Sequence, residues 1–229
     1  MNVFQGIKYP EVIFETESQF NHKIQVIQIG AVKKIKVDGI DQSISHESKA
    51  CKRLVWGQAV DLMKRENPAA KKVLIFGLGG GTMQHLISQS YPGIELVSVE
   101  IDSVMVDIAK KYFNLDLIPN HRVVVADAFR VVIEPETYNL DESSFDTVII
   151  DVYQGEKFPD LGTSGNFFSA LKKLILPNGL VIINRIYRED HQFDVDNFIG
   201  YVEKILRSVK SEIVAGYTNS DNVLIFGRN

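Results

Sequence analysis

Three carboxylates follow apolar, strand-forming stretches of this sequence, at the point where each stretch ends. Glu100 follows V-S-V, Asp127 follows V-V-V-A, and Asp151 follows V-I-I. A carboxylate about 20 residues after a glycine turn accepts hydrogen bonds from ribose hydroxyls, so Glu100 is a candidate for holding a nucleoside. Asp127 is a candidate to meet an adenine amino group. Asp151 is a candidate catalytic base for an amine, with Tyr153 as its hydrogen-bonding neighbour.

A glycine-rich turn precedes these carboxylates, in the stretch V-L-I-F-G-L-G-G-G-T that ends at Thr82. Gly77, Gly79 and Gly81 allow backbone conformations that other residues resist, and they leave no side chain between the main chain and a ligand. A dinucleotide fingerprint G-x-G-x-x-G beginning at Gly77 would need glycine where the chain has Thr82. The pattern therefore favours an adenosyl sulfonium compound over a nicotinamide dinucleotide.

Each carboxylate has a purely structural alternative. Glu100 or Asp102 could cap the helix that follows, and Asp127 could cap a turn. Asp151 could be a turn residue satisfied by its neighbours. Independent turns would seldom produce the whole set at successive strand ends, so the joint interpretation is a nucleoside site.

The elements that must position these residues alternate along the chain. Strands are predicted at residues 73–76, 95–99, 122–126, 146–151, 180–185, 212–217 and 222–227. Helices are predicted at 82–90, 103–113, 165–176 and 193–209. This alternation predicts an α/β fold with a mostly parallel sheet covered by helices on both faces. The last two strands have room only for a loop between them, so we expect them to pair antiparallel.

The first 44 residues predict a small β appendage, and residues 45–229 the main nucleoside-binding domain. Strand patterns at 11–16, 23–30 and 32–37 are separated by turn signals. Lysines 33, 34 and 36 are interpreted as residues that solubilise an exposed or edge strand. A helix is predicted at 45–66 to bridge the two parts. Its Trp56 is either a packing aromatic or a residue at the mouth of a pocket.

Composition excludes several classes of function. A net charge of −4 argues against a general nucleic-acid binder. A single cysteine, Cys51, excludes an intramolecular disulfide and fits a reducing compartment. The sequence has neither a signal-peptide pattern nor an apolar run of roughly 18 residues, so we expect a protein of the cytoplasm without membrane association. The histidines show no metal-ligand spacing, and no metal is expected.

The motifs resemble the spermidine synthases (polyamine aminopropyltransferases), a family within the class I S-adenosylmethionine-dependent methyltransferase fold. The glycine turn, V-E-I-D, A-D-A and the Asp151 loop occur in that family's order, behind a β appendage and a bridging helix. The resemblance covers most of the chain. It implies a Rossmann-like α/β fold with a seven-stranded, mostly parallel sheet whose last strand is antiparallel.

The resemblance also implies a reaction and its residues. In that family, decarboxylated S-adenosylmethionine donates an aminopropyl group to putrescine. The glycine loop, Glu100-Ile101 and Asp127-Ala128 would hold the nucleoside, and Asp151 would deprotonate and orient the attacking amine.

Several positions depart from the family's pattern. Thr82 takes the place of an aspartate that meets the aminopropyl ammonium, and Gln154 takes the place of a second acid. Losing two charged hydrogen bonds, each of roughly 1.5–3 kcal/mol, would weaken the binding of a diamine unless Glu156 or Asp160 replaces them. Glu156 and Gln154 belong to a predicted lid over residues 151–165.

Two further departures concern the acceptor side. A Tyr-His pair in the bridging helix aligns with Trp56-Gly57, and a glutamine in the appendage aligns with Asn21. Trp56, Gln154 and Glu156 are therefore candidate substrate-binding residues whose acceptor is uncertain.

Three functions follow from these observations. The first is aminopropyl transfer from decarboxylated S-adenosylmethionine to a small-molecule amine such as putrescine. The second is methyl transfer from S-adenosylmethionine itself, which the loss of an acid at Thr82 favours. The third is a non-catalytic nucleoside-binding relative. A homodimer, with the appendage as an interface, is left open.

Overall fold

The computed structural model describes residues 9–154, 157–161, 166–188, 191–216 and 221–229. The small N-terminal sheet contains β1 (Glu11–Thr16), β2 (Ile24–Ile29), β3 (Val32–Val37) and β4 (Ile40–Ile44). The large sheet contains β5 (Lys72–Phe76), β6 (Glu95–Glu100), β7 (His121–Val125), β8 (Phe145–Ile150), β9 (Ile175–Tyr187), β10 (Arg207–Val214) and β11 (Asp221–Arg228). The helices are α1 (Val55–Glu66), α2 (Thr82–Ser90), α3 (Ser103–Phe113), α4 (Ala128–Ile133), α5 (Asn166–Leu174) and α6 (Gln192–Val202), with 3-10 turns at Leu115–Leu117 and Pro135–Tyr138.

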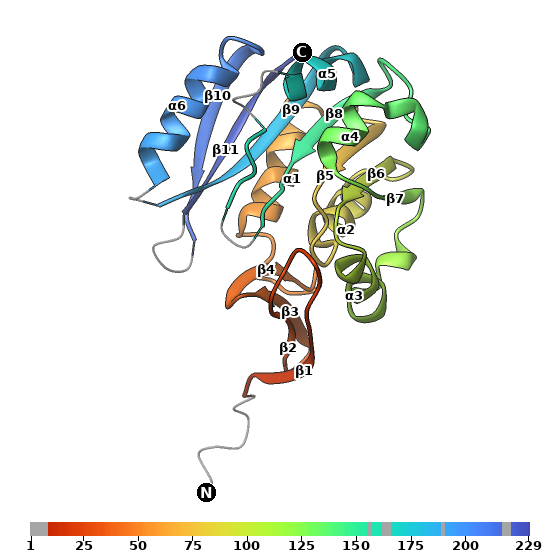
Figure 1. Ribbon diagram of the computed structural model, residues 1–229, viewed down its shortest axis with the longest axis vertical. Coiled ribbons are helices and arrows are strands. Elements are labelled where there is room, and N and C mark those ends of the chain that lie inside the picture. The colour runs from red at the N-terminus through yellow and green to blue at the C-terminus, as the bar shows by residue number, and fades with distance from the viewer. Residues whose placement is uncertain (1–8, 155–156, 162–165, 189–190, 217–220) are drawn as a thin grey trace, which may run out of the picture.

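The large sheet has the order β10-β11-β9-β8-β5-β6-β7, and the small sheet has the order β1-β2-β3-β4. Strand β11 runs antiparallel to both of its neighbours, whereas the pairs from β9 to β7 are parallel. This confirms the predicted mostly parallel seven-stranded sheet with an antiparallel strand at the C-terminus. The small sheet lies below the large one in Figure 1, on the side where β4 meets the turn after β5. The division of the chain into domains at residue 44 stays a prediction.

Two predicted helices were wrong in extent, and two short elements were not predicted. Residues 46–54 form turns, so the bridging helix begins only at Val55, after an extended Leu54. The predicted last helix ends at Val202, because the chain from Arg207 onward pairs with β11. The six-residue α4 and the strand β4 were not predicted, since both are too short to show a clear period.

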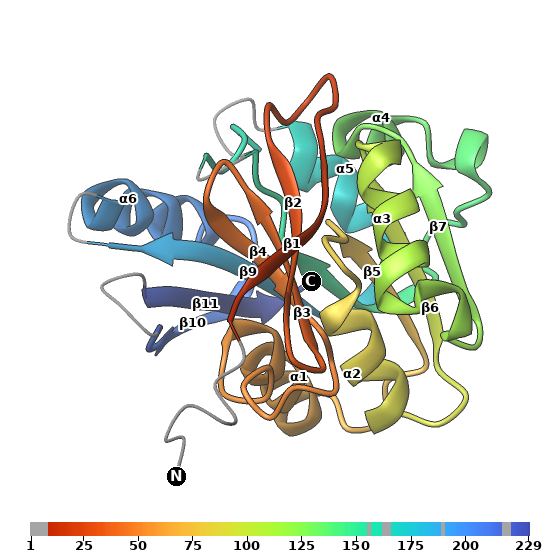
Figure 2. The ribbon, with the colours of Figure 1, turned by 90° about the horizontal axis from the view of Figure 1, so that it is seen from below.

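Alternating residues of the central strands pack on opposite faces of the large sheet. Ile75, Ile149 and Ile182 face α1 and α2, while Leu74, Phe76 and Val148 face α4, α5 and α6. Figure 2 shows these two groups of helices on either side of the sheet. Because both faces of these strands are buried, their sequences are continuous apolar runs.

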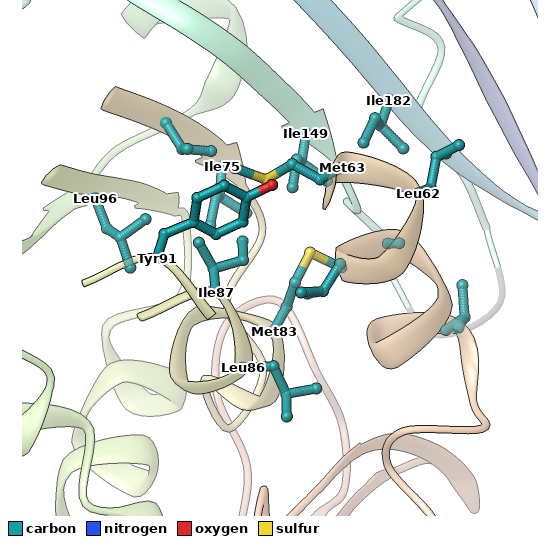
Figure 3. Packing of buried hydrophobic residues seen from close by; sticks show 14 of the residues in the cluster. Leu62, Met63, Ile75, Met83, Leu86, Ile87, Tyr91, Leu96, Ile149 and Ile182 are labelled. Carbon is teal, nitrogen blue, oxygen red and sulfur yellow. The ribbon is translucent and has the colours of Figure 1, made fainter. Parts of the chain in front are cut away.

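The core on the α1 and α2 side is filled by flexible and branched side chains (Figure 3). Met63 and Met83 lie between the helices, and Ile87 and Tyr91 extend the contact toward the sheet. This packing fixes α2, whose first turn follows the glycine loop. None of the helices in the described residues is both long and apolar enough to cross a lipid bilayer.

The small sheet is attached to the large domain through α3. Ile35 and Val37 of β3 pack with Met105 and Ile108 of that helix in a separate apolar cluster. Beside this cluster, the buried Asp102 accepts hydrogen bonds from Ser18 Oγ (2.5 Å), Asn21 Nδ2 (2.7 Å) and the backbone N–H of Val104 (3.0 Å). One carboxylate therefore caps α3 and holds the loop between β1 and β2.

We expect Asp102→Ala to lower the free energy of unfolding by about 2–4 kcal/mol, because it removes a helix cap and two hydrogen bonds to a buried charge. Denaturant unfolding measures the change. Asp107→Ala, on the exposed face of the same helix, is the matched control and should stay within about 0.5 kcal/mol of the unmodified protein. Equal effects of the two substitutions would contradict the anchoring role of Asp102.

Candidate functional site

A cavity of about 640 Å³ lies between the small sheet and the carboxyl ends of the large sheet's strands. This is the edge at which open parallel sheets bind their ligands. Its lining combines the glycine turn, the strand-end acids, β4 and the ends of β9 and β11. The predicted site residues among the lining are Gly77, Gly79, Glu100, Ile101, Asp127, Ala128, Asp151, Tyr153, Gln154 and Trp56.

The glycine turn is shaped by close backbone contacts. Gly77 has φ 98°, and a β-carbon there would lie 2.1 Å from the carbonyl oxygen of Asp151. Gly79 has φ 55°, and a β-carbon there would press on Gln42 and Ser43 of β4 at 3.1–3.2 Å. Both positions need glycine for φ and for space. Gly81 also has positive φ, but it packs against Leu115 and does not line the cavity.

Thr82 is turned away from the cavity. Its hydroxyl donates to the carbonyl of Ile44 (2.5 Å) and lies 2.8 Å from Ser43 Oγ, and the side chain is buried. As a candidate cofactor-binding residue, Thr82 would need a side chain that faces the ligand, and this geometry does not provide one. Thr82 instead ties α2 to β4. The direction of the Thr82 side chain could not be predicted from sequence because β4, its partner, was not predicted.

Glu100 has a different role from the helix cap, which belongs to Asp102. Its carboxylate accepts from the backbone N–H of Leu78 (3.1 Å) and of Asp102 (3.0 Å), so it joins the glycine turn to the end of β6. Burial raises the pKa of Glu100 to about 7, and the nearby Asp102 adds to the rise. The next residue, Ile101, is 40% exposed, which leaves an apolar surface beside the carboxylate.

Asp127 caps α4, as its structural alternative predicted. Its Oδ1 accepts from the backbone N–H of Phe129 (2.8 Å) and of Arg130 (3.2 Å). The cap uses one carboxylate oxygen, and Asp127 and Ala128 both border the cavity. Binding of an adenine by Asp127 therefore stays a prediction.

Asp151 follows β8 and sits against the glycine turn. Its Oδ1 accepts from Asn184 Nδ2 at 2.7 Å. Burial raises the pKa of Asp151, and the bond from Asn184 opposes that rise. A carboxylate whose pKa is raised is a stronger base than an ordinary aspartate, which suits the acceptance of a proton.

Tyr153 anchors the segment after β8. Its hydroxyl donates to the carbonyl of Asn184 (3.1 Å) and accepts from the backbone N–H of Ile186 (2.7 Å). Burial raises the pKa of Tyr153, and the charge of Asp151 raises it further. These bonds hold the hydroxyl of Tyr153 in place, and a catalytic role of Tyr153 stays a prediction.

The candidate acceptor residues are spread over both parts of the cavity. Gln154 Nε2 donates to the carbonyl of Phe20 (3.2 Å), so it links the predicted lid to the small sheet. Trp56 packs against the core and also lines the cavity, so it is both a packing aromatic and a residue of the pocket. Glu156 lies outside the described residues. Within the residues that are described, no three His, Cys, Asp or Glu side chains come together as a metal site.

Sequence reasoning missed a cationic side of the cavity. β3 lies between β2 and β4, so it is an interior strand rather than an edge. Lys34 and Lys36 border the cavity and both contact Asp41, at 2.6 and 3.1 Å. Arg188 adds a third cation to the lining. The sequence does contain a pattern that could have revealed this cationic side. Lys34 and Lys36 alternate with the buried Ile35 and Val37, and alternation along a strand puts the two lysines on the face opposite the buried residues.

Comparison with known proteins identifies the family. A family model described as the spermine/spermidine synthase domain matches residues 58–227. The chain belongs to the spermine/spermidine synthase family. Its fold is that family's: the spermidine synthase of Thermotoga maritima superposes with a TM-score of 0.74 at 18% identity, over 95% of this chain and 72% of that one.

Curated relatives of this family member fall into two groups. The polyamine aminopropyltransferase of Vibrio vulnificus (strain CMCP6) is 33% identical over 118 residues, which are 52% of this chain and 38% of that protein. The eEF1A lysine and N-terminal methyltransferase homolog of Drosophila pseudoobscura pseudoobscura is 28% identical over 172 residues, which are 69% of this chain and 25% of that protein. The chain thus spans less than half the length of either relative.

The raised pKa of Glu100 predicts a pH dependence of stability in this family member. The folded state binds the proton more tightly than the unfolded state, whose pKa lies near the ordinary 4.5. Stability must therefore fall as the pH rises from about 4.5 to about 7. We expect the free energy of unfolding of Glu100→Gln to decrease by about 2–3 kcal/mol less than that of the unmodified protein over this pH range.

Denaturant unfolding at several pH values measures this effect. Glu95→Gln is the matched control, because Glu95 lies at the exposed start of the same strand. If Glu100→Gln and the unmodified protein lose stability in parallel over this range, the carboxyl of Glu100 is not the group that titrates.

Proposed function

We propose that this protein transfers an aminopropyl group from decarboxylated S-adenosylmethionine to a small-molecule amine such as putrescine. The observation that carries the proposal is the half-buried carboxylate of Asp151 at the cavity, against the glycine turn and hydrogen-bonded by Asn184. Family membership over residues 58–227 supports the same class of transferase.

The nucleoside of the donor is proposed to lie over the glycine turn. Glu100 would accept from the ribose hydroxyls, beside the exposed Ile101. Asp127 and Ala128 border the far side of the same cavity and would meet the adenine. Gly77 brings the glycine turn against the backbone of Asp151, so a sulfonium bound over this turn would lie close to that residue.

The reaction itself is an in-line displacement. The lone pair of the amine forms a bond to the propyl carbon, and the electrons of the carbon–sulfur bond return to sulfur as a neutral thioether. The attacking nitrogen gains positive charge and releases a proton, which Asp151 accepts. Alignment of donor and nucleophile supplies most of the remaining rate enhancement.

Methyl transfer from S-adenosylmethionine is the second candidate. Lys34 and Lys36 border the cavity on β3, beside the strand β4 whose Ser43 binds the backbone N–H of Gly80 at 2.9 Å. Cations beside the glycine turn suit the carboxylate of an undecarboxylated donor better than a bare ammonium tail. A relative named as a lysine and N-terminal methyltransferase also fits an amine acceptor. Homodimerisation and a cytoplasmic location stay predictions.

Titration calorimetry with both donors separates these candidates. We expect decarboxylated S-adenosylmethionine to bind more tightly than S-adenosylmethionine, and a reversed order would identify the methyl donor. If the lysines hold a carboxylate, the pair Lys34→Gln and Lys36→Gln should weaken only S-adenosylmethionine, by about tenfold or more. Lys33→Gln is the control, because Lys33 shares the strand without being among the residues that line the cavity. Binding without product from any amine would indicate the non-catalytic relative.

Asp151→Asn tests the proposed base. The amide keeps the shape of the side chain but accepts no proton, so we expect kcat to fall by about 10²–10⁴-fold. Donor affinity by calorimetry should change little. Full turnover of the variant on its amine acceptor would remove Asp151 from the mechanism.

A further inference from the structure

A chain of amide groups leads from β11 to the carboxylate of Asp151. Asn222 Nδ2 donates to Asn184 Oδ1 at 3.0 Å, and Asn184 Nδ2 donates to Asp151 Oδ1 at 2.7 Å. Asn184 is 3% exposed, and both asparagines border the cavity. Neither residue was a candidate from sequence, because each lies in an apolar strand far along the chain from Asp151.

The direction of this chain has a chemical consequence. An amide can present either its oxygen or its nitrogen to a neighbour, and the neighbours decide which one. Because Asn222 donates to the oxygen of Asn184, the nitrogen of Asn184 must face Asp151. One carboxylate oxygen of Asp151 is then held by a donor, in a residue that lines the cavity.

We propose that Asn184, oriented by Asn222, is a positioning residue that holds Asp151 with its second oxygen directed at the attacking amine. This proposal rests on the proposed role of Asp151 as the base. It holds whether the transferred group is aminopropyl or methyl, since both reactions release a proton from the same nitrogen.

A neutral donor suits this task better than a cation. An arginine or lysine at the place of Asn184 would stabilise the ionised carboxylate strongly and weaken it as a base. Asn184 opposes the effect of burial on the pKa of Asp151 only in part. The result is a carboxylate that is oriented and still basic.

Other ionisable groups lie around Asp151, farther from it than Asn184. Tyr153 lies on its own segment, and Arg185 of β9 stacks on Phe158 and Phe198 at 4.2 and 4.6 Å. The charged groups on the remaining walls of the cavity are Lys34, Lys36, Asp41, Glu100, Asp127 and Arg188. They are the same in every variant below, so a change in the titration of Asp151 reports on the amide chain.

The test is a carbon-13 NMR titration of the Asp151 carboxyl in the full chain, with Asp151→Asn used to assign its signal. Asn184→Leu removes the donor at similar volume and should raise the midpoint by about 1–2 pH units. Asn222→Ala leaves Asn184 free to turn and should give a smaller rise. Ser211→Ala, at an exposed position of β10, is the control and should leave the midpoint unchanged.

The same variants give a kinetic readout. The acidic limb of the kcat/KM profile should move to higher pH by the shift seen in the titration, with donor affinity unchanged. If Asn184→Leu does not fold, the titration of Asp151 in Asn222→Ala tests the proposal instead. An unshifted midpoint in the folded variants overturns the proposal. Failure of the proposed function appears separately, as absent donor binding or absent product, because the titration needs no substrate.

Discussion

The site depends on the close approach of two backbone segments, at Gly77 and Asp151. The N–H of Asp151 donates to the carbonyl of Phe76 at 2.8 Å, which extends the parallel pairing of β5 and β8 past the last paired residues. A β-carbon at Gly77 would collide with Asp151 at 2.1 Å. The glycine turn and the residue that carries the Asp151 carboxylate are therefore held together by one ladder of hydrogen bonds.

The small sheet turns this open edge into a cavity. Ser43 of β4 binds the backbone N–H of Gly80, and Thr82 binds the carbonyl of Ile44, so β4 lies directly against the glycine turn. On the other side, Asp102 holds the loop that carries Ser18 and Asn21. Two groups of hydrogen bonds, one at the glycine turn and one at Asp102, thus fix the orientation of the sheet, while its apolar face packs on α3.

Enclosure explains the behaviour of the acids. The pKa values of Glu100 and Asp151 are both raised, and burial is the first cause in each case. Glu100 has two backbone donors and Asp151 has one amide donor, and these hydrogen bonds limit the rise of the pKa. The cations lie on β3 and after β9.

The sequence by itself determined the α/β class, the strand-end acids and the glycine turn. These are properties of short stretches, since a strand shows in a local apolar run and a positive φ favours glycine within a few residues. Only the tertiary structure decided that Thr82 faces β4, that Lys34 and Lys36 face the cavity, and that Asn184 holds a carboxylate 33 residues away. Those assignments depend on which distant strands become neighbours. Strand pairing and side-chain direction are set by the packing of the whole chain, so no local pattern contains them.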